Sequence, residues 1–223
     1  MLTGPAIVPS KTTSALILCH GYGANGADLA DLAPLFQQHF PTLAVFCPDA
    51  PTPLSFGGYE WFSLNDFTPQ QTITENYLDI LANRAKPSAI LLQTFRRHIQ
   101  QKFCIEDNKL ILGGFSQGGL VAQIAGLTDE TPIGGLLAFS SVPLVFKTAV
   151  LKDQIKQHLD ILLTHGGQDT VIIPQAMTLS QTQLKSVHQK IKTHLSPNLG
   201  HGIDESCLKK AIDFLKPIID RID

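Results

Sequence analysis

One serine in this sequence has the neighbours that a nucleophile needs. Ser116 lies in residues 114–118 (GFSQG), directly after the apolar run 110–112 and before an apolar helical pattern. A sharp turn from strand to helix strains the backbone of such a serine, and glycines two residues before and after it prevent clashes. We therefore predict that Ser116 attacks an acyl carbonyl, with the N–H of Gln117 at the helix N-terminus facing the oxyanion.

A serine hydroxyl needs a base to remove its proton, and one of the eight histidines is placed for this role. His201 lies in residues 198–202 (NLGHG), after the last strand pattern and before the last helix pattern. Loops at the carboxyl ends of parallel strands are where such a sheet assembles its site. The glycine on each side of His201 allows the loop to place the imidazole closely, so we predict that His201 is the general base.

The base in turn needs an acid that holds its tautomer, and this acid should follow a strand between the nucleophile and the histidine. Asp169 fits because it ends residues 165–169 (HGGQD), directly after the strand-like run 161–164. Asp153 and Asp160 precede that strand, and Asp204 opens the last helix, where an N-terminal cap is more natural. We predict that Asp169 orients His201.

A glycine-rich segment after the first clear strand can supply a second oxyanion donor. Residues 20–23 read HGYG, and we predict that Tyr22 contributes its N–H while Gly21 and Gly23 allow close approach. The segment lacks both the GKS or GKT ending of a phosphate loop and the full GxGxxG spacing.

The elements that must position these residues alternate along the chain. Short apolar runs rich in β-branched residues alternate with helical patterns, which predicts a mainly parallel sheet of about six or seven strands wrapped by helices. The strand patterns cover residues 15–19, 43–47, 109–113, 134–140, 160–164 and 190–195, with a further strand near 6–8. The helical patterns cover residues 27–38, 88–102, 118–127, 174–188 and 205–221, with Pro217 expected to kink or weaken the last one.

The stretch 48–87 is unusual for its prolines, glycines and aromatic residues, and it predicts an elaborated loop. This loop either covers the end of the sheet or forms a wall of the substrate pocket. The sequence shows no repeat, no low-complexity tract and no linker, so we predict a single domain over residues 1–223.

The bulk composition excludes several classes of protein. Seventeen Lys and Arg balance nineteen Asp and Glu without any run of five like charges, so neither nucleic acid nor an anionic membrane is an expected partner. No apolar run is long enough to span a bilayer, and the first ten residues do not resemble a signal peptide. The four cysteines form no CxxC pair, which predicts reduced thiols and a cytoplasmic protein.

The order of these motifs resembles the phospholipase/carboxylesterase family of the α/β-hydrolase fold, which includes acyl-protein thioesterases and small bacterial carboxylesterases. The resemblance extends over about residues 15–215. It is carried by segments 18–26 (LCHGYGANG), 47–51 (CPDAP), 61–62 (WF) and 113–119 (GGFSQGG), and by the turn from His165 to Asp169.

The resemblance implies a triad of Ser116, Asp169 and His201, backbone donors at Tyr22 and Gln117, no separate cap domain, no cofactor and no metal. It also implies a shallow hydrophobic groove for an acyl chain. Four aromatic residues either contribute to this groove or pack near it: Phe56, Tyr59, Trp61 and Phe62. Because family members often pair, a homodimer is also consistent with it.

We therefore expect a serine carboxylesterase that hydrolyses short to medium acyl esters through an acyl-enzyme. Acyl-protein thioesterase and lysophospholipase remain alternatives, because esters and thioesters pass through similar tetrahedral intermediates. A protein that keeps the fold but only binds a ligand is the alternative from another class.

Overall fold

A seven-stranded sheet forms the centre of the molecule. The computed structural model describes residues 1–64, 74–145 and 153–221. The strand order is β1-β3-β2-β6-β7-β8-β9, and only β1 is antiparallel to its neighbour. These strands are β1 (Ala6–Ile7), β2 (Ser14–Cys19), β3 (Leu43–Phe46), β6 (Leu110–Phe115), β7 (Gly135–Phe139), β8 (Asp160–Gly166) and β9 (Lys190–Ser196). The expected mainly parallel sheet is confirmed.

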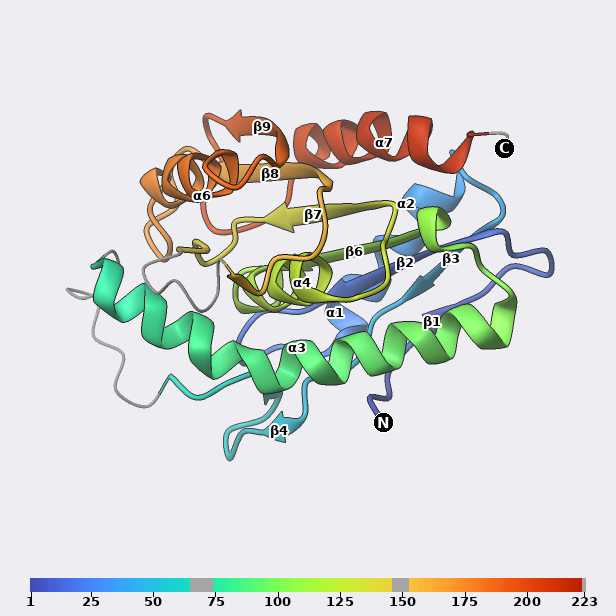
Figure 1. The fold of residues 1–223 in the computed structure, drawn as a ribbon, viewed down its shortest axis with the longest axis horizontal. Helices are drawn as coiled ribbons and strands as arrows, with labels where there is room; N and C mark the ends of the chain where they lie inside the picture. Colours follow the sequence, from blue (N-terminus) through green and yellow to red (C-terminus); the bar gives the residue numbers. More distant parts are fainter. Residues whose placement is uncertain (65–73, 146–152, 222–223) are drawn as a thin grey trace.

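Helices cover both faces of this sheet (Figure 1). One face packs against α3 (Glu75–Phe103), α4 (Gln117–Thr128) and α6 (Gln175–Lys185), and the other packs against α1 (Gly26–Ala30), α2 (Ala33–Gln37) and α7 (Glu205–Ile219). Strands β2, β3, β6 and β7 are buried along nearly their whole length, which explains why their sequences are continuous apolar runs. No separate cap domain is evident in the described residues.

The structure differs from the expected elements mainly at prolines. The pattern 27–38 forms two short helices, α1 and α2, with Pro34 at the start of the second. Helix α3 begins at Glu75 and continues through Pro87, so the expected loop 48–87 is wrong for its last part. The earlier part contains a two-stranded ribbon of β4 (Thr52–Pro53) and β5 (Tyr59–Glu60), and residues 65–73 lie outside the described ones.

The last helix also contains an internal proline, Pro217, and α7 continues to Ile219. A helical proline removes one backbone hydrogen bond, and this cost is tolerated where an apolar face remains packed. Phe214, Leu215 and Ile218 are buried against the sheet on both sides of Pro217. Packing therefore outweighs the local effect of the proline.

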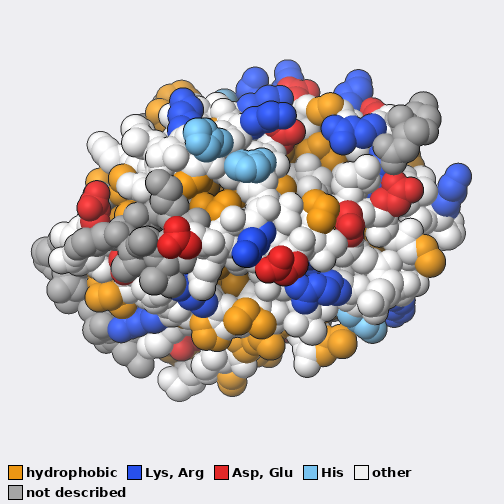
Figure 2. Space-filling model, in the orientation of Figure 1, with side chains coloured by type: hydrophobic (Ala, Val, Ile, Leu, Met, Phe, Trp, Pro, Cys, Tyr) orange, Lys and Arg blue, Asp and Glu red, His pale blue; other side chains and the backbone are white. Residues whose placement is uncertain are grey.

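The surface carries no large region of a single charge on the described residues of the face drawn in Figure 2, where basic and acidic side chains are interspersed. Within the described residues, no helix has the length and apolar character needed to cross a membrane.

Candidate active site

The turn between β6 and α4 holds Ser116 in a strained conformation. Its φ is 54° and its ψ is −117°, a combination that residues with side chains rarely adopt. A Cβ at Gly114 would lie 2.4 Å from the backbone of Gly118, and a Cβ at Gly118 would lie 2.3 Å from the carbonyl oxygen of Cys19. Both glycines of the pentapeptide are therefore required by close backbone packing.

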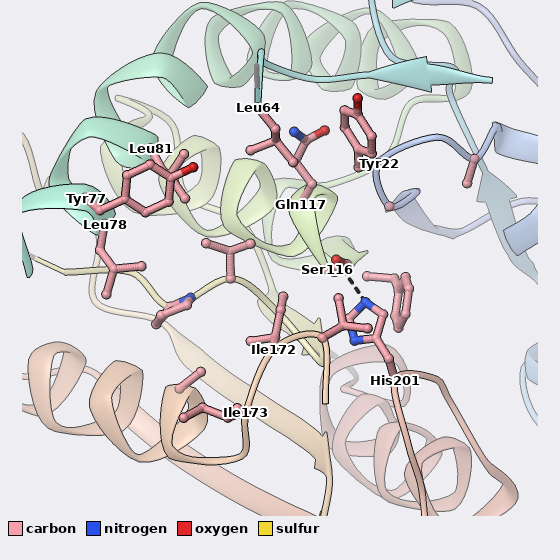
Figure 3. Close-up of a pocket in the computed structure, with 17 residues that line it drawn as sticks. Tyr22, Leu64, Tyr77, Leu78, Leu81, Ser116, Gln117, Ile172, Ile173 and His201 are labelled. Carbon is pink, nitrogen blue, oxygen red and sulfur yellow. Dashed lines mark hydrogen bonds between the residues drawn. The ribbon is translucent and has the colours of Figure 1, made fainter. Parts of the chain in front are cut away.

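Three side chains from three separate loops meet at this turn, as the sequence predicts. The Nε2 atom of His201 lies 3.1 Å from the Oγ atom of Ser116, and its Nδ1 atom lies 2.7 Å from Oδ2 of Asp169 (Figure 3). The Asp169 side chain is fully buried, and Ser116 is only 9% exposed. A proton can therefore pass from the hydroxyl to the imidazole while the carboxylate holds the opposite nitrogen.

The loops that carry Asp169 and His201 are joined by backbone contacts. The N–H of Gln168 donates to the carbonyl of Leu199 at 2.8 Å. A Cβ at Gly166 would lie 2.0 Å from the carbonyl oxygen of Gly200, so only glycine allows this approach. Side chains that are 32 residues apart in sequence thus reach hydrogen-bonding distance.

The carboxylate of Asp169 has a different set of partners at each oxygen. Oδ1 accepts hydrogen bonds from the N–H groups of Val171 and Ile172, both at 2.9 Å. Oδ2 faces His201, and it also lies 3.3 Å from Nε2 of His165. The two backbone donors fix the orientation of the carboxylate.

His165 is a member of this cluster that the sequence analysis quoted only as part of a turn. Its ring is buried, and its Nε2 is 2.7 Å from the carbonyl oxygen of Ile172. Burial lowers the pKa of His165, so the ring is neutral at neutral pH and donates from Nε2. Its spacing of four residues from Asp169 is the sequence signal that could have revealed it.

Several backbone N–H groups near Ser116 have no hydrogen-bond acceptor within the described residues. They include the N–H of Tyr22, in the loop after β2, and the N–H of Gln117, at the first position of α4. Gly21 brings the loop against the turn, since a Cβ there would lie 3.3 Å from the Cβ of Ser116. Unsatisfied donors beside a nucleophile can accept the charge that forms on a carbonyl oxygen.

The buried ring of His20 determines how this loop presents its N–H groups. Its Nε2 accepts a hydrogen bond from Ala50 N–H at 3.0 Å, so the proton resides on Nδ1, which donates to the Gly21 carbonyl at 2.7 Å. Burial lowers the pKa of His20, which favours this neutral form. Because a trans peptide points its C=O and N–H in opposite directions, the Tyr22 N–H faces away from His20.

The side chain of Gln117 connects the turn to the segment after β5. Its Oε1 accepts from the N–H of Trp61 at 2.8 Å, and its Nε2 donates to the carbonyl of Phe62 at 2.7 Å. The Trp61 indole in turn donates to the carbonyl of His20 at 2.8 Å. Trp61 and Phe62 therefore connect the loop after β2 with the turn before α4.

An apolar cavity of about 470 Å³ opens beside Ser116. Figure 3 shows Tyr77, Leu78 and Leu81 on one wall and Ile172 and Ile173 on another. The remaining lining residues are Gly21, Tyr22, Ala24, Leu64, Phe115, Gln117, Val142, Pro143, Val171, Ala176 and His201. Tyr77, Leu78 and Leu81 lie within the stretch 48–87, for which a pocket wall was one of the two interpretations, but they lie on a helix and not on the expected loop.

Only part of the expected pocket lining is found there. Among the described residues, Gly21 lines the cavity, whereas Gly23 and the four aromatic residues Phe56, Tyr59, Trp61 and Phe62 do not. Trp61 and Phe62 are buried in the core, and Phe56 is 71% exposed with its ring 6.3 Å from that of Tyr22. These aromatic rings are too deep or too far out to reach the space next to Ser116.

No group of three or more His, Cys, Asp or Glu side chains is placed to hold a metal ion in the described parts of the chain. The three cysteines Cys19, Cys47 and Cys207 are buried as free thiols, and Cys104 is exposed. Burial raises the pKa of Cys47 to about 12, so this thiol stays protonated.

Comparison with known proteins places the chain among esterases and thioesterases. A family model described as Phospholipase/Carboxylesterase matches residues 5–219. Acyl-protein thioesterase 1 of Neurospora crassa is 26% identical over 98% of this chain and 93% of its own length. The crystal structure of esterase PE8 is 27% identical, with a TM-score of 0.85 over 97% of this chain and 99% of that one.

The fold likeness extends to more distant structures. The crystal structure of Arabidopsis thaliana SOBER1 has a TM-score of 0.77 at 20% identity, covering 93% of this chain and 100% of that one.

Proposed function

The chain belongs to the phospholipase/carboxylesterase family of α/β-hydrolases, and from this membership we propose that it is a serine carboxylesterase for short to medium acyl esters. The observation that carries the proposal is the connected set of Ser116, His201 and Asp169 at the mouth of an apolar cavity. The proposal treats residues 1–223 as one catalytic domain.

In the first half of the reaction, His201 removes the proton of Ser116 as Oγ attacks the acyl carbon. The carbonyl oxygen becomes an oxyanion that accepts from the N–H groups of Tyr22 and Gln117. The imidazolium, stabilised by Asp169, then gives its proton to the leaving oxygen. In the second half, His201 activates water, which releases the acid and restores Ser116.

The role of His20 in this scheme is to position an oxyanion donor. Replacing His20 with leucine is expected to lower kcat about 10- to 100-fold with little change in KM, because an oxyanion donor acts mainly in the transition state. Replacement with asparagine should cost less, since its amide can still donate to the Gly21 carbonyl. Kinetics on a p-nitrophenyl ester, alongside thermal unfolding of each variant, measures this order. Equal kcat values for folded His20→Leu and the unchanged protein would contradict the assignment.

The substrate class follows from the cavity beside Ser116. Its walls of Leu78, Leu81, Ile172 and Ile173 are apolar, and none of its described lining residues is a lysine, an arginine or a carboxylate. Burial of an acyl chain there contributes about 0.8 kcal/mol for each methylene. The cavity volume of about 470 Å³ limits the length of the acyl chain that it can enclose, which favours short and medium acyl groups over long ones.

Thioester hydrolysis is the second candidate, because curated relatives such as the Neurospora crassa protein are named acyl-protein thioesterase 1. A thioester is attacked in the same way and yields the same acyl-enzyme. A small-molecule ester or an acylated protein would then be the partner of the site.

A fluorophosphonate probe followed by an acyl-chain panel tests the proposed function. The probe should label Ser116 alone. Ser206 also contacts a histidine, His194, but within the described residues only the histidine at Ser116 bonds a carboxylate through its other ring nitrogen. The kcat/KM values for acetyl, butanoyl, octanoyl and palmitoyl esters should rise to a medium chain and then fall, and a matched thioester series separates the second candidate. An unlabelled Ser116 would instead indicate a protein that only binds its ligand.

A further inference from the structure

A second cavity of about 320 Å³ lies next to the first one and shares three of its lining residues, Gly21, Ala24 and Phe115. The rest of its wall comes from other parts of the chain. The residues that line only the second cavity are His20, Asp28, Leu29, Leu32, Gly202 and Ile203. His20 directly follows β2, and the others belong to the region of α1 and to the loop that carries His201, whereas the first cavity is walled by α3 and by residues 171–173. The two cavities therefore extend from the site in different directions.

The position of this second cavity relative to His201 indicates which half of a substrate it receives. Gly202 and Ile203 directly follow His201, and the ring of Phe115 lies 4.7 Å from the His201 ring between centroids. In acyl transfer, the leaving oxygen or sulfur must lie beside the imidazole that protonates it. His201 itself lines the first cavity, but Phe115 lines both cavities and Gly202 and Ile203 line the second, so a leaving group beside His201 extends past Phe115 into the second cavity.

We propose that the second cavity binds the alcohol or thiol half of the substrate and that this half is apolar and uncharged. The inference rests on the proposed function, and it adds a leaving-group site to it. Leu29, Leu32 and Ile203 supply the apolar surface.

The charges around the second cavity exclude an anionic leaving group. Asp28 is its one acidic lining residue among those described, and the lining contains no described lysine or arginine. The carboxylate of Asp28 is held in place by the N–H of Asn25 at 2.9 Å. Both ring nitrogens of His20 already have partners, so this residue offers no free donor to an anion.

The walls of the second cavity are fixed before a ligand binds. Leu29 is 8% exposed and packs in the core, and the carbonyl of Gly202 accepts from Ser140 Oγ at 3.2 Å. A Cβ at Gly21 would lie 3.1 Å from the ring of Phe115, so a larger residue there would crowd a side chain that lines both cavities. A preformed apolar site of this kind discriminates between leaving groups of different size.

Filling the second cavity tests the inference. Leu32 is half-buried at its wall, while Leu35 is exposed on α2 and lies outside its lining. For methyl and benzyl esters of one acid, Leu32→Trp should lower the benzyl-to-methyl ratio of kcat/KM at least about tenfold. The matched control Leu35→Trp should keep the ratio of the unchanged protein, and thermal unfolding verifies that both variants fold.

The leaving-group site can also be tested on the unchanged protein. An alcohol can replace water in the second half-reaction: its oxygen bonds to the acyl carbon, the bond from that carbon to Ser116 Oγ breaks, and His201 carries the alcohol proton to Oγ. Benzyl alcohol should capture the acyl-enzyme at least about tenfold more efficiently than 4-(hydroxymethyl)benzoate, its anionic counterpart. The measured quantity is the ratio of new ester to free acid.

Equal capture of the two alcohols, or an unchanged benzyl-to-methyl ratio in folded Leu32→Trp, would overturn the leaving-group site. Neither result would affect the proposed function, which predicts loss of methyl ester hydrolysis in Ser116→Ala. Persistence of that hydrolysis would instead reject the proposed function.

Discussion

Alanine in place of Ser116 is expected to lower kcat for ester hydrolysis by about 10⁴- to 10⁶-fold, since a triad nucleophile has no substitute. The strained turn should survive, because Gly114 and Gly118 make the close contacts that shape it and alanine differs from serine only by the hydroxyl. The unfolding temperature should therefore stay near that of the unchanged protein. Single-turnover kinetics on a p-nitrophenyl ester measures the loss.

The control for this change is Ser186→Ala, because Ser186 is exposed and its hydroxyl donates to the nearby carbonyl of Gln183. It removes the same hydroxyl from a site remote from His201, and it should leave both hydrolysis and fluorophosphonate labelling intact. If Ser116→Ala hydrolyses the ester as fast as this control does, Ser116 is not the nucleophile.

The positions of the three central residues could be predicted because each follows a strand. Ser116 directly follows β6, and Asp169 and His201 lie in the loops that follow β8 and β9; the carboxyl ends of these strands share one edge of the sheet. Strand patterns and chain order therefore place these residues together, although they are far apart in sequence. The two residues proposed to supply the oxyanion donors, Tyr22 and Gln117, follow β2 and β6 at the same edge of the sheet.

The helical form of the cavity wall within residues 48–87 could not be predicted in this way. Residues Tyr77, Leu78 and Leu81 lie on α3, and the helix continues through Pro87 although a proline normally ends one. Packing decides this case, because Ala85, Ser88 and Ala89 around the proline are all buried. A single sequence reveals that a proline inside a helix lowers helix stability, but it does not reveal the tertiary contacts that offset this loss.

Trp61 illustrates a second limit. Its aromatic ring and its place in a glycine-rich segment are compatible with either a pocket wall or the core. Only the structure shows its indole donating to the carbonyl of His20 and its N–H donating to Gln117. The indole N–H therefore allows the buried Trp61 ring to stabilise the loop after β2 through a hydrogen bond.

The partners of Asp169 determine what happens when its charge is removed. Oδ1 accepts from two backbone N–H groups, those of Val171 and Ile172, and only an oxygen can satisfy both. An asparagine at this position must therefore keep its carbonyl oxygen there and turn its NH₂ group toward His201, 2.7 Å away in the present arrangement. His201 Nδ1 would then have to accept rather than donate.

Asparagine in place of Asp169 is thus expected to lower kcat about 10⁴-fold, because the proton of His201 moves to Nε2 and blocks acceptance from Ser116. KM should change little, since Asp169 does not line the acyl cavity. The matched control is Asp213→Asn, which removes one negative charge from an exposed position of α7 and should retain full activity. The measurement is kcat at pH 7, with folding of each variant verified. If Asp169→Asn keeps more than about a tenth of the activity, Asp169 does not set the tautomer of His201. Because the backbone donors force the orientation of the amide, such activity could not be attributed to a flipped side chain.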